Sequence, residues 1–309
     1  MKNQPHHPVL LDSVVGVLAP KAGESYLDAT AGFGGHAEAL IAKIGSQSQV
    51  VLVDRDAIAI QHLSTKFQDG AEIIHASFAE AAIRLSEEGR RFDLILLDLG
   101  VSSPQLDNPE RGFSFKNDAP LDMRMDQSQA LTAERIVNTY PQNEIERIIR
   151  EYGEEYRARA ITSAIIAARP VKTTRQLADI VRRVVGTAGK INPATKTFQA
   201  IRIAVNSELT QLEVALPRLA SLLTTGGRLA VLSFHSLEDR IVKQFFDYES
   251  RDCICPPKQP ICTCDHVASI RKLTTKAITG DSTEIVSNPR ARSAKLRAAE
   301  KITQKPRRT

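Results

Sequence analysis

The sequence predicts an α/β fold, namely a doubly wound, mostly parallel sheet interrupted by an all-helical insertion. Three observations lead to this prediction. Strand and helix patterns alternate over the first hundred residues, several strands are continuous apolar runs, and a long series of helical patterns follows before the sheet pattern resumes. Alternating strands and helices form parallel sheets with right-handed crossovers, whose strands are apolar throughout because both faces are buried.

Four strands make up the first half of the expected sheet, and three of them end at an aspartate. The carboxyl ends of parallel strands form the edge at which ligands of such folds bind. The acids that end these strands are Asp28, Asp54 and Asp98. The expected strands span residues 24–29, 50–53, 72–76 and 92–97, and the expected helices span 36–44 and 57–67.

The pattern changes after Asp98. Residues 99–126 are rich in Gly, Pro, Asp and Asn and predict a long loop. Helices follow, with starts at Thr132, Thr174 and Pro193 and stops at Pro141, Pro170 and Gly186. The sheet resumes with a strand over 226–234 and a helix over 237–248, and Glu284–Val286 is expected to complete it. The predicted parts are a sheet domain over 1–105 and 218–288, a helical insertion over 106–217 and a basic C-terminal tail over 289–309.

The net charge of +5 is unevenly distributed. Residues 289–309 carry eight Lys or Arg and one acid, a balance of +7, so the rest of the chain sums to −2. Basic tails of this kind contact nucleic-acid phosphates, but a solvated terminus has the same composition, and both interpretations stay open. The 309 residues contain no apolar run near the ~20 residues that a membrane span needs, and no secretory signal pattern, so we expect a cytoplasmic protein.

All four cysteines lie in one short stretch, as Cys253-Ile-Cys255 and Cys262-Thr-Cys264, with His266 nearby. Four thiolates can surround a zinc ion, although the one-residue spacers are tighter than those of usual structural zinc sites. A reduced cluster of cytoplasmic thiols would have the same pattern. The sequence leaves both possibilities open.

The glycine turn after the first strand favours S-adenosylmethionine over a dinucleotide as the ligand. Such turns let a ligand approach the backbone and direct helix N–H groups toward it. Asp28, directly before the turn, suits the cationic amino group of methionine and would repel a pyrophosphate. The pattern Gly32-x-Gly34-Gly35 also lacks the full G-x-G-x-x-G spacing. Asp54 can accept ribose hydroxyls of either ligand, and Phe78 would flank the adenine.

Asp98 begins the loop Asp-Leu-Gly-Val-Ser-Ser-Pro-Gln at the end of the fourth strand. A carboxylate there can accept hydrogens from an exocyclic amine of a base. Accepting them favours a pyramidal nitrogen, whose lone pair can then attack a sulfonium methyl group. This position is therefore expected to carry the chemistry.

Several runs resemble the bacterial 16S ribosomal RNA (cytosine-N4) methyltransferase family over nearly the whole chain. They include Gly32–His36, Asp98–Asp107, Arg111–Phe115, Leu121–Asp126, Thr197–Arg202, Asn206–Leu209, Ser233–Arg240 and Asn288–Ser293. The resemblance implies a Rossmann-like class I methyltransferase fold with a helical substrate-recognition insertion. It also implies S-adenosylmethionine-dependent methylation of N4 of a cytosine in the decoding centre of 16S rRNA, within the small ribosomal subunit.

The resemblance also implies the site. The cofactor contacts that it implies are Gly34, Gly35, His36, Asp54, Phe78, Asp98 and Gln105, and no metal is assigned to the site. The position of Asp98 at the sheet edge makes it an expected catalytic residue, and so does that of His235, which follows the fifth strand at the same edge and could stack on the base or take a proton. Related amino-methyltransferases carry an aromatic side chain in the loop after the fourth strand, which this chain lacks. Phe113, Phe115 or His235 could replace it. His235 could equally precede a helix whose N-cap is Ser236, with Asp239 as its partner.

Three alternatives are weighed against this prediction. A dinucleotide-dependent oxidoreductase conflicts with Asp28 and the incomplete glycine pattern. A non-catalytic RNA-binding protein conflicts with the intact Asp98 loop. A DNA amino-methyltransferase is separated only by the resemblance. Basic residues of the insertion that could meet RNA phosphates, or form a solvated helix face, are Arg157, Arg159, Lys196 and Arg202.

Overall fold

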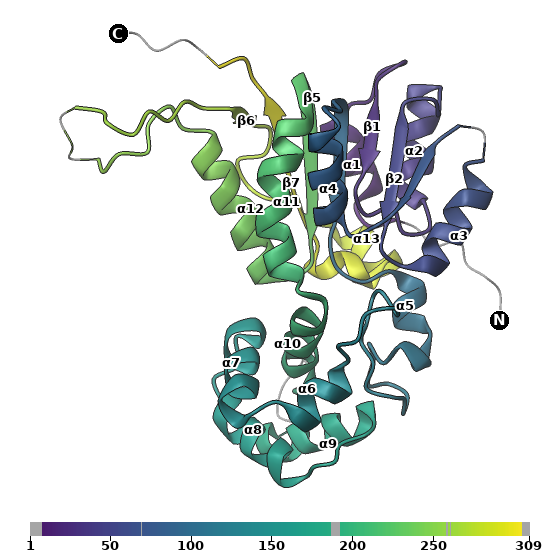
Figure 1. Ribbon diagram of the computed structural model, residues 1–309, viewed down its shortest axis with the longest axis vertical. Helices are drawn as coiled ribbons and strands as arrows, with labels where there is room; N and C mark the ends of the chain where they lie inside the picture. Colours follow the sequence, from purple (N-terminus) through teal and green to yellow (C-terminus); the bar gives the residue numbers. More distant parts are fainter. Residues whose placement is uncertain (1–7, 69, 187–191, 258, 260, 305–309) are drawn as a thin grey trace. The chain divides into compact units, whose positions relative to one another are not determined.

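The computed structural model describes residues 8–68, 70–186, 192–257, 259 and 261–304 (Figure 1). The chain divides into two compact units. The sheet unit comprises Met1–Gly100 and Thr210–Thr309, and the helical unit comprises Val101–Leu209. Each has its own apolar core. None of the described helices is long and apolar enough to cross a membrane.

Seven strands of the sheet unit form one sheet in the order β3-β2-β1-β4-β5-β7-β6. Neighbouring strands from β3 to β5 are parallel, whereas β7 runs antiparallel to both β5 and β6. This confirms the predicted doubly wound, mostly parallel α/β fold. The strands are β1 (Tyr26–Asp28), β2 (Val50–Asp54), β3 (Glu72–His75), β4 (Phe92–Asp98), β5 (Leu223–Ser233), β6 (Ile270–Lys272) and β7 (Lys295–Lys301).

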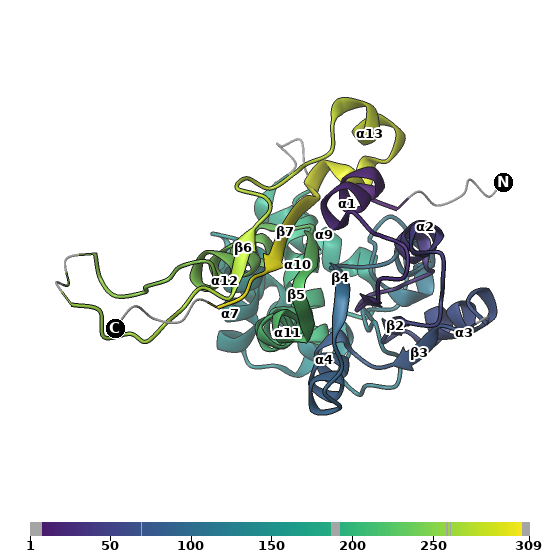
Figure 2. The ribbon, with the colours of Figure 1, turned by 90° about the horizontal axis from the view of Figure 1, so that it is seen from above.

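Helices cover both faces of the sheet, as Figure 2 shows from above. This explains the continuous apolar strands, because all of Val50–Val53 is buried between the two layers. One face carries α1 (Leu11–Leu18), α2 (Gly35–Ile44), α3 (Ala57–Lys66) and α13 (Ser282–Ser287). The other carries α4 (Phe78–Glu87), α11 (Glu208–Leu222) and α12 (Ser236–Glu249). The helices α1 and α4 were not predicted from the sequence.

The last part of the chain differs from the prediction. Residues 284–286 were expected to form a strand, but they lie in α13, which begins at Asp281 as N-cap. The strand that completes the sheet is β7, inside the segment expected to be a basic tail. Its Leu296 and Ala298 are buried. The high charge of the segment masked this alternation. In the folded chain, Arg297 and Lys295 pair with one carboxylate that is distant in sequence, Asp239. Residues 305–309 of the expected tail lie outside the described residues.

The core of the helical unit is built by helices together with the loop residues Phe113, Leu121, Met123, Met125 and Val171. After the short α5 (Ser103–Asp107) and a 3-10 turn at Pro109–Arg111 come α6 (Ala133–Thr139), α7 (Gln142–Gly153), α8 (Ala158–Ala167), α9 (Thr174–Val185) and α10 (Ala194–Asn206). Thr132 and Thr173 cap α6 and α9 with their side chains. The expected insertion ran to residue 217, whereas this unit ends at Leu209, because α11 continues with its apolar face in a core of the sheet unit.

The loop at residues 111–126 of the helical unit is held by buried polar contacts. The Arg111 guanidinium, itself buried, donates to the carbonyl of Met125 at 2.8 Å. Asn206 accepts the Met125 N–H at 2.9 Å and donates to the Met123 carbonyl at 2.8 Å. Gly112 has φ +70°, and a Cβ there would lie 2.4 Å from the Pro120 carbonyl oxygen. Only glycine fits at this position.

Candidate active site

Carboxylates gather at the carboxyl edge of the parallel strands, as the sequence predicted. Asp28, Asp54 and Asp98 are the last residues of β1, β2 and β4. The strand order reverses between β1 and β4, so Asp28 and Asp98 flank the topological switch point of the sheet. Ligands of open α/β sheets bind at this point.

Asp98 is held by its backbone rather than by its side chain. Its N–H donates to the Thr30 hydroxyl at 2.6 Å. Its Oδ1 atom is buried and has no hydrogen-bond partner among the described residues. Burial raises the pKa of Asp98 well above its usual range, and the nearby Asp28 and Glu238 raise it further. A half-buried carboxyl whose Oδ1 atom is buried and unsatisfied is suited to receive hydrogen-bond donors from a ligand.

Asp28 and Asp54 are fixed by protein donors. Asp28 accepts the Tyr26 hydroxyl at 2.7 Å and the Thr30 N–H at 3.2 Å, but burial outweighs these bonds and raises its pKa to about 7. Asp54 accepts the N–H groups of Gly32 and Asp56, each at 2.8 Å. Each carboxylate oxygen of Asp54 keeps a second lone pair, which can accept a ribose hydroxyl.

The turn between β1 and α2 contains open space beside its backbone. Gly32 has φ +54°, and a Cβ placed there would have no atom within 4 Å, so a ligand can approach this backbone closely. No side chain caps α2, which leaves its first N–H groups available to an anionic ligand group. A Cβ on Gly34 would strike Phe67 at 2.5 Å, and one on Gly35 would strike Pro8 at 2.7 Å. These two glycines therefore also serve packing.

His36 and Phe78 lie at the starts of α2 and α4. His36 is buried, with Nε2 3.0 Å from the Val9 carbonyl oxygen and Nδ1 3.6 Å from Asp98 Oδ2. A carbonyl only accepts, so Nε2 carries the proton and Nδ1 presents its lone pair toward Asp98 when the ring is neutral. Phe78 is half-buried and packs against the core next to the edge of β3. Their cofactor contacts stay predictions.

His235 caps the start of α12, a role that was predicted for the next residue, Ser236. His235, not Ser236, is the N-cap of α12, and its capping-box partner is Glu238, not Asp239. Glu238 Oε2 accepts the N–H groups of Phe234 at 2.8 Å and His235 at 3.2 Å. Since the His235 side chain is only 6% exposed, stacking on a base would require this loop to move.

Two residues beside Asp98 were missed by the sequence analysis, namely Thr30 and Glu238. The spacing of His235 and Glu238 is that of a capping box, but histidine is an unusual cap residue. Thr30 carries no sequence signal of its own. Its role follows from the pairing of β1 with β4.

The remaining predicted residues belong to the helical unit. Gln105 is buried and accepts the Ser102 N–H at 3.0 Å, within the capping box of α5. Phe113 is 8% exposed, and Phe115 packs edge-on against Phe198 with ring centroids 4.9 Å apart. Both aromatic rings thus belong to the core of that unit. The predicted contact of Gln105 with the cofactor is not tested by these features.

The four basic residues of the insertion divide into two groups. Three have partners within the helical unit. Arg202 forms a two-fold pair with Glu208 at 2.8 and 2.9 Å, and Arg157 and Lys196 donate to main-chain carbonyls of Val184 and Glu154. Arg159 is exposed and has no hydrogen-bond or ion-pair partner among the described residues.

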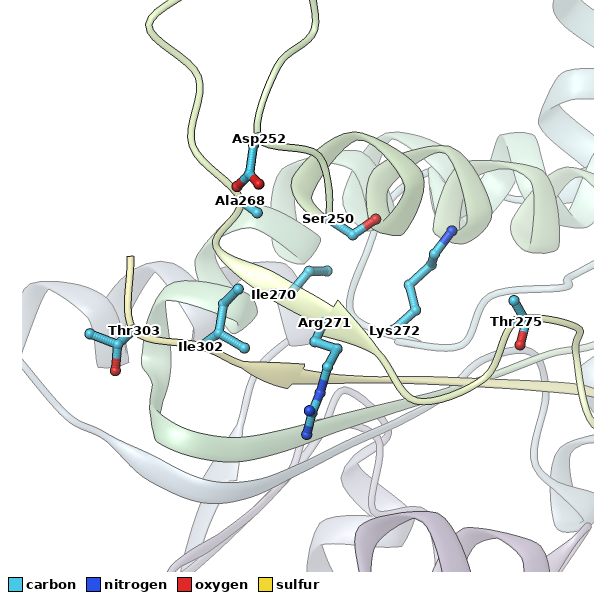
Figure 3. A pocket seen from close by; sticks show the side chains of 9 residues that line it. All are labelled: Ser250, Asp252, Ala268, Ile270, Arg271, Lys272, Thr275, Ile302 and Thr303. Carbon is cyan, nitrogen blue, oxygen red and sulfur yellow. The ribbon is translucent and has the colours of Figure 1, made fainter. Parts of the chain in front are cut away.

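A cavity of about 430 Å³ lies elsewhere in the sheet unit, beside the edge strand β6 (Figure 3). Two of its lining cations are already paired, Arg271 with Glu300 and Lys272 with Asp247. None of the predicted site residues lines it. The cavity is thus separate from the candidate site.

The charge of the candidate site favours S-adenosylmethionine over a dinucleotide as its ligand. Three carboxylates at one sheet edge favour a cationic ligand and oppose a pyrophosphate. S-adenosylmethionine carries a sulfonium and an ammonium group, and the uncapped α2 can receive its carboxylate. The open cradle at Gly32 and the unsatisfied Asp98 oxygen also fit such a ligand.

Comparison with known proteins gives the family. The sequence pattern of the MraW methylase family matches residues 3–302. The chain belongs to the MraW methylase family. "Ribosomal RNA small subunit methyltransferase H" of Heliobacterium modesticaldum is 46% identical over 308 residues, covering 96% of this chain and 98% of the relative. The protein of the same name from Geobacter sp. is 48% identical over 313 residues, covering 98% and 100%. The MraW match confirms the predicted methyltransferase class.

Proposed function

We propose that this MraW-family chain methylates the exocyclic N4 amine of a cytosine in 16S rRNA. The methyl donor is S-adenosylmethionine, which supplies the methyl group and a sulfonium charge. The observation that carries the proposal is Asp98, whose Oδ1 atom is buried and unsatisfied at the switch point of a methyltransferase sheet. The name of the two relatives supports the small-subunit rRNA as the acceptor.

Asp98 has two tasks in this proposal. Its carboxylate accepts a hydrogen of the cytosine amine, which disfavours delocalisation of the nitrogen lone pair into the ring. The raised pKa of Asp98 falls while a cation lies beside it, and it rises again once that charge is neutralised by methyl transfer. Asp98 can then hold the proton that the methylated amine releases.

The neighbours of Asp98 position it. The Thr30 hydroxyl fixes its backbone, and Glu238 anchors the loop at Phe234 and His235 through their N–H groups. Asp54 would bind the ribose, and the first turn of α2 the methionine carboxylate. His36, packed beside Asp98, limits water access to that side of the carboxyl.

The acceptor is proposed to be the assembled small subunit rather than naked RNA, which places the enzyme in the cytoplasm with its substrate. The target base must leave its stack to reach the sheet edge, so RNA around it must be held. The helical unit is proposed to recognise RNA shape, and Arg159 is its candidate phosphate contact.

The test is methyl transfer from labelled S-adenosylmethionine to small ribosomal subunits that lack this modification, followed by nucleoside analysis. The expected result is N4-methylcytidine at one site, formed faster on subunits than on naked 16S rRNA. Methylation of DNA alone, or of another atom of the base, would reject the proposal. Equal rates on naked RNA would reject only the subunit requirement.

A further inference from the structure

The four cysteines lie outside the candidate site, in the long segment that joins α12 to β6. This segment leaves the sheet unit as two arms (Figure 1). Its base is closed by the Ser269 N–H, which donates to the Glu249 carbonyl at 2.9 Å. Cys253 and Cys255 lie on the outgoing arm, and Cys262 and Cys264 lie on the returning arm.

The two arms have no apolar core to hold them together. No described residue from 251 to 267 is buried, and Ile261 is 75% exposed. Small structures without a core are usually stabilised by a disulfide or a metal ion. A disulfide needs sulfur atoms about 2.05 Å apart, whereas the Sγ atoms of Cys253 and Cys262 are 3.5 Å apart.

The four sulfur atoms instead form a tetrahedron. The Cys262 Sγ atom lies 3.6 Å from the Sγ atom of Cys264 and 4.0 Å from that of Cys255. The Sγ atoms of Cys253 and Cys264 are 3.8 Å apart. All four lie within 4.8 Å of one another. Zinc–sulfur bonds of about 2.3 Å in a tetrahedron require sulfur separations of about 3.8 Å. The observed spacing is that of a four-thiolate zinc site.

Backbone N–H groups support the thiolates. Ile254 N–H points to Cys264 Sγ and Thr263 N–H points to Cys255 Sγ, each at 3.4 Å. Each bond crosses from one arm to the other, so it also aligns the arms. Such outer donors stabilise thiolate charge in metal sites. His266 is engaged differently, because its Nε2 lies 3.0 Å from the Tyr248 carbonyl oxygen and its ring packs on Tyr248.

We propose that Cys253, Cys255, Cys262 and Cys264 bind one structural Zn²⁺ ion that joins the two arms. Four thiolates in a tetrahedron suit Zn²⁺ and close the coordination shell, which leaves no position for a substrate. The site is thus structural, and it is independent of the methyl-transfer chemistry at Asp98.

The chain is well suited to a direct test, since it has four cysteines and all of them belong to this cluster. Metal analysis of the full-length protein, purified without chelator, is expected to find one zinc per chain. A thiol reagent is expected to react slowly with the zinc-loaded protein and quickly once a chelator is added. Replacement of zinc by Co²⁺ is expected to give the visible absorption of tetrahedral cobalt with sulfur-to-metal charge transfer.

Two variants identify the ligands. The double variant Cys253→Ser/Cys264→Ser removes one thiolate from each arm and is expected to lose the metal while still binding S-adenosylmethionine, which shows that the sheet unit is folded. The control His266→Ala is expected to keep one zinc per chain. Absence of zinc, iron in its place, two disulfide bonds in freshly prepared protein, or zinc retained by the double variant would overturn the proposal.

Discussion

Asp98 shows how one residue combines a binding and a chemical requirement. It lies at the switch point, its N–H is fixed by Thr30, and its Oδ1 has no partner among the described residues. Leaving a buried oxygen unsatisfied costs about 1–3 kcal/mol. Burial and the two nearby acids add a further cost by raising its pKa. A cationic ligand and an amine donor would relieve both costs.

Asp98→Asn is expected to lower kcat for methyl transfer at least about 100-fold, because the amide cannot take up a proton. Radiolabel transfer to small subunits measures this. The control is Asp93→Asn on the same strand, whose carboxylate binds Ser25 and Thr224 away from the carboxyl edge. Comparable losses in the two variants would contradict a specific role for Asp98.

The affinity for S-adenosylmethionine is expected to rise with pH, by up to about tenfold per pH unit. The reason is that Asp98 has a raised pKa in the free protein and must ionise beside a cation. Calorimetric titrations from about pH 6 to pH 8.5 measure this dependence, and Asp98→Asn should flatten it. An unchanged slope in the variant would assign the proton to another group.

Asp28 is expected to make the protein less stable as the pH rises. Its pKa is about 7 in the folded chain and 3.8 ordinarily. The stabilisation by protonated Asp28 is complete below 3.8 and is lost as the pH rises through about 7. Relative to Asp28→Asn, the wild type should lose up to about 4 kcal/mol of unfolding free energy between pH 4 and pH 8. Parallel urea-unfolding profiles of the two proteins would contradict this.

At the scale of elements, the high charge of its segment prevented the prediction of β7, and a glycine determines the shape of the β1–α2 turn. The segment 289–309 has the composition of a basic tail, yet β7 is an interior strand of the sheet. Arg297 and Lys295 reach Asp239 at the start of α12, so their charges are compensated within the sheet unit. Beside the switch point of the sheet, the β1–α2 turn depends on backbone space next to Gly32.

Arg297→Ala is expected to lower the unfolding free energy by about 2 kcal/mol, because it leaves the buried Asp239 without its closest partner. Arg271→Ala on the neighbouring strand is the control. Arg271 pairs with Glu300 but is 67% exposed, so its loss should cost under about 0.5 kcal/mol. Denaturant unfolding measures both. Equal costs would mean that residues 295–301 behave as a solvated terminus.

Gly32→Ala is expected to weaken S-adenosylmethionine binding at least about tenfold, because the added methyl group occupies the space beside the turn. Gly45→Ala, at the far end of α2, is the matched control. Both glycines have positive φ and open space around a Cβ, so both variants should lose about 1 kcal/mol of stability. Only the first should lose affinity in calorimetry, and equal affinities would place the cofactor elsewhere.

At the scale of the whole molecule, two units with separate cores suit a division of labour. The sheet unit carries the carboxylate edge, and the helical unit carries the loop at 111–126 with Arg111 and Asn206 at its centre. We propose that the first binds the methyl donor and the second recognises RNA. A defect confined to the helical unit should therefore affect the two activities unequally.

Gly112→Ala is expected to reduce methyl transfer to small subunits far more than S-adenosylmethionine binding. Its Cβ would clash with the backbone at Pro120 and Asp122 and disrupt the loop. Gly186→Ala, in the same unit, has positive φ but open space and should retain transfer. Filter binding of subunits and calorimetry with the cofactor separate the effects. Equal losses of transfer and cofactor binding by Gly112→Ala would contradict the division.

The sequence by itself determined the fold class, the parallel strands and the acids at their ends. These follow from local patterns, since buried parallel strands must be apolar and their ligand edge must carry the polar residues. It missed β7, α1 and α4, and it placed the cap of α12 on Ser236 instead of His235. Only the tertiary structure decided these features, because Arg297 is neutralised by a residue 58 positions away. It also decided that burial, with Asp28 and Glu238, raises the pKa of Asp98, and that four thiols converge from two arms. Such effects depend on distances in space, which local sequence patterns do not encode.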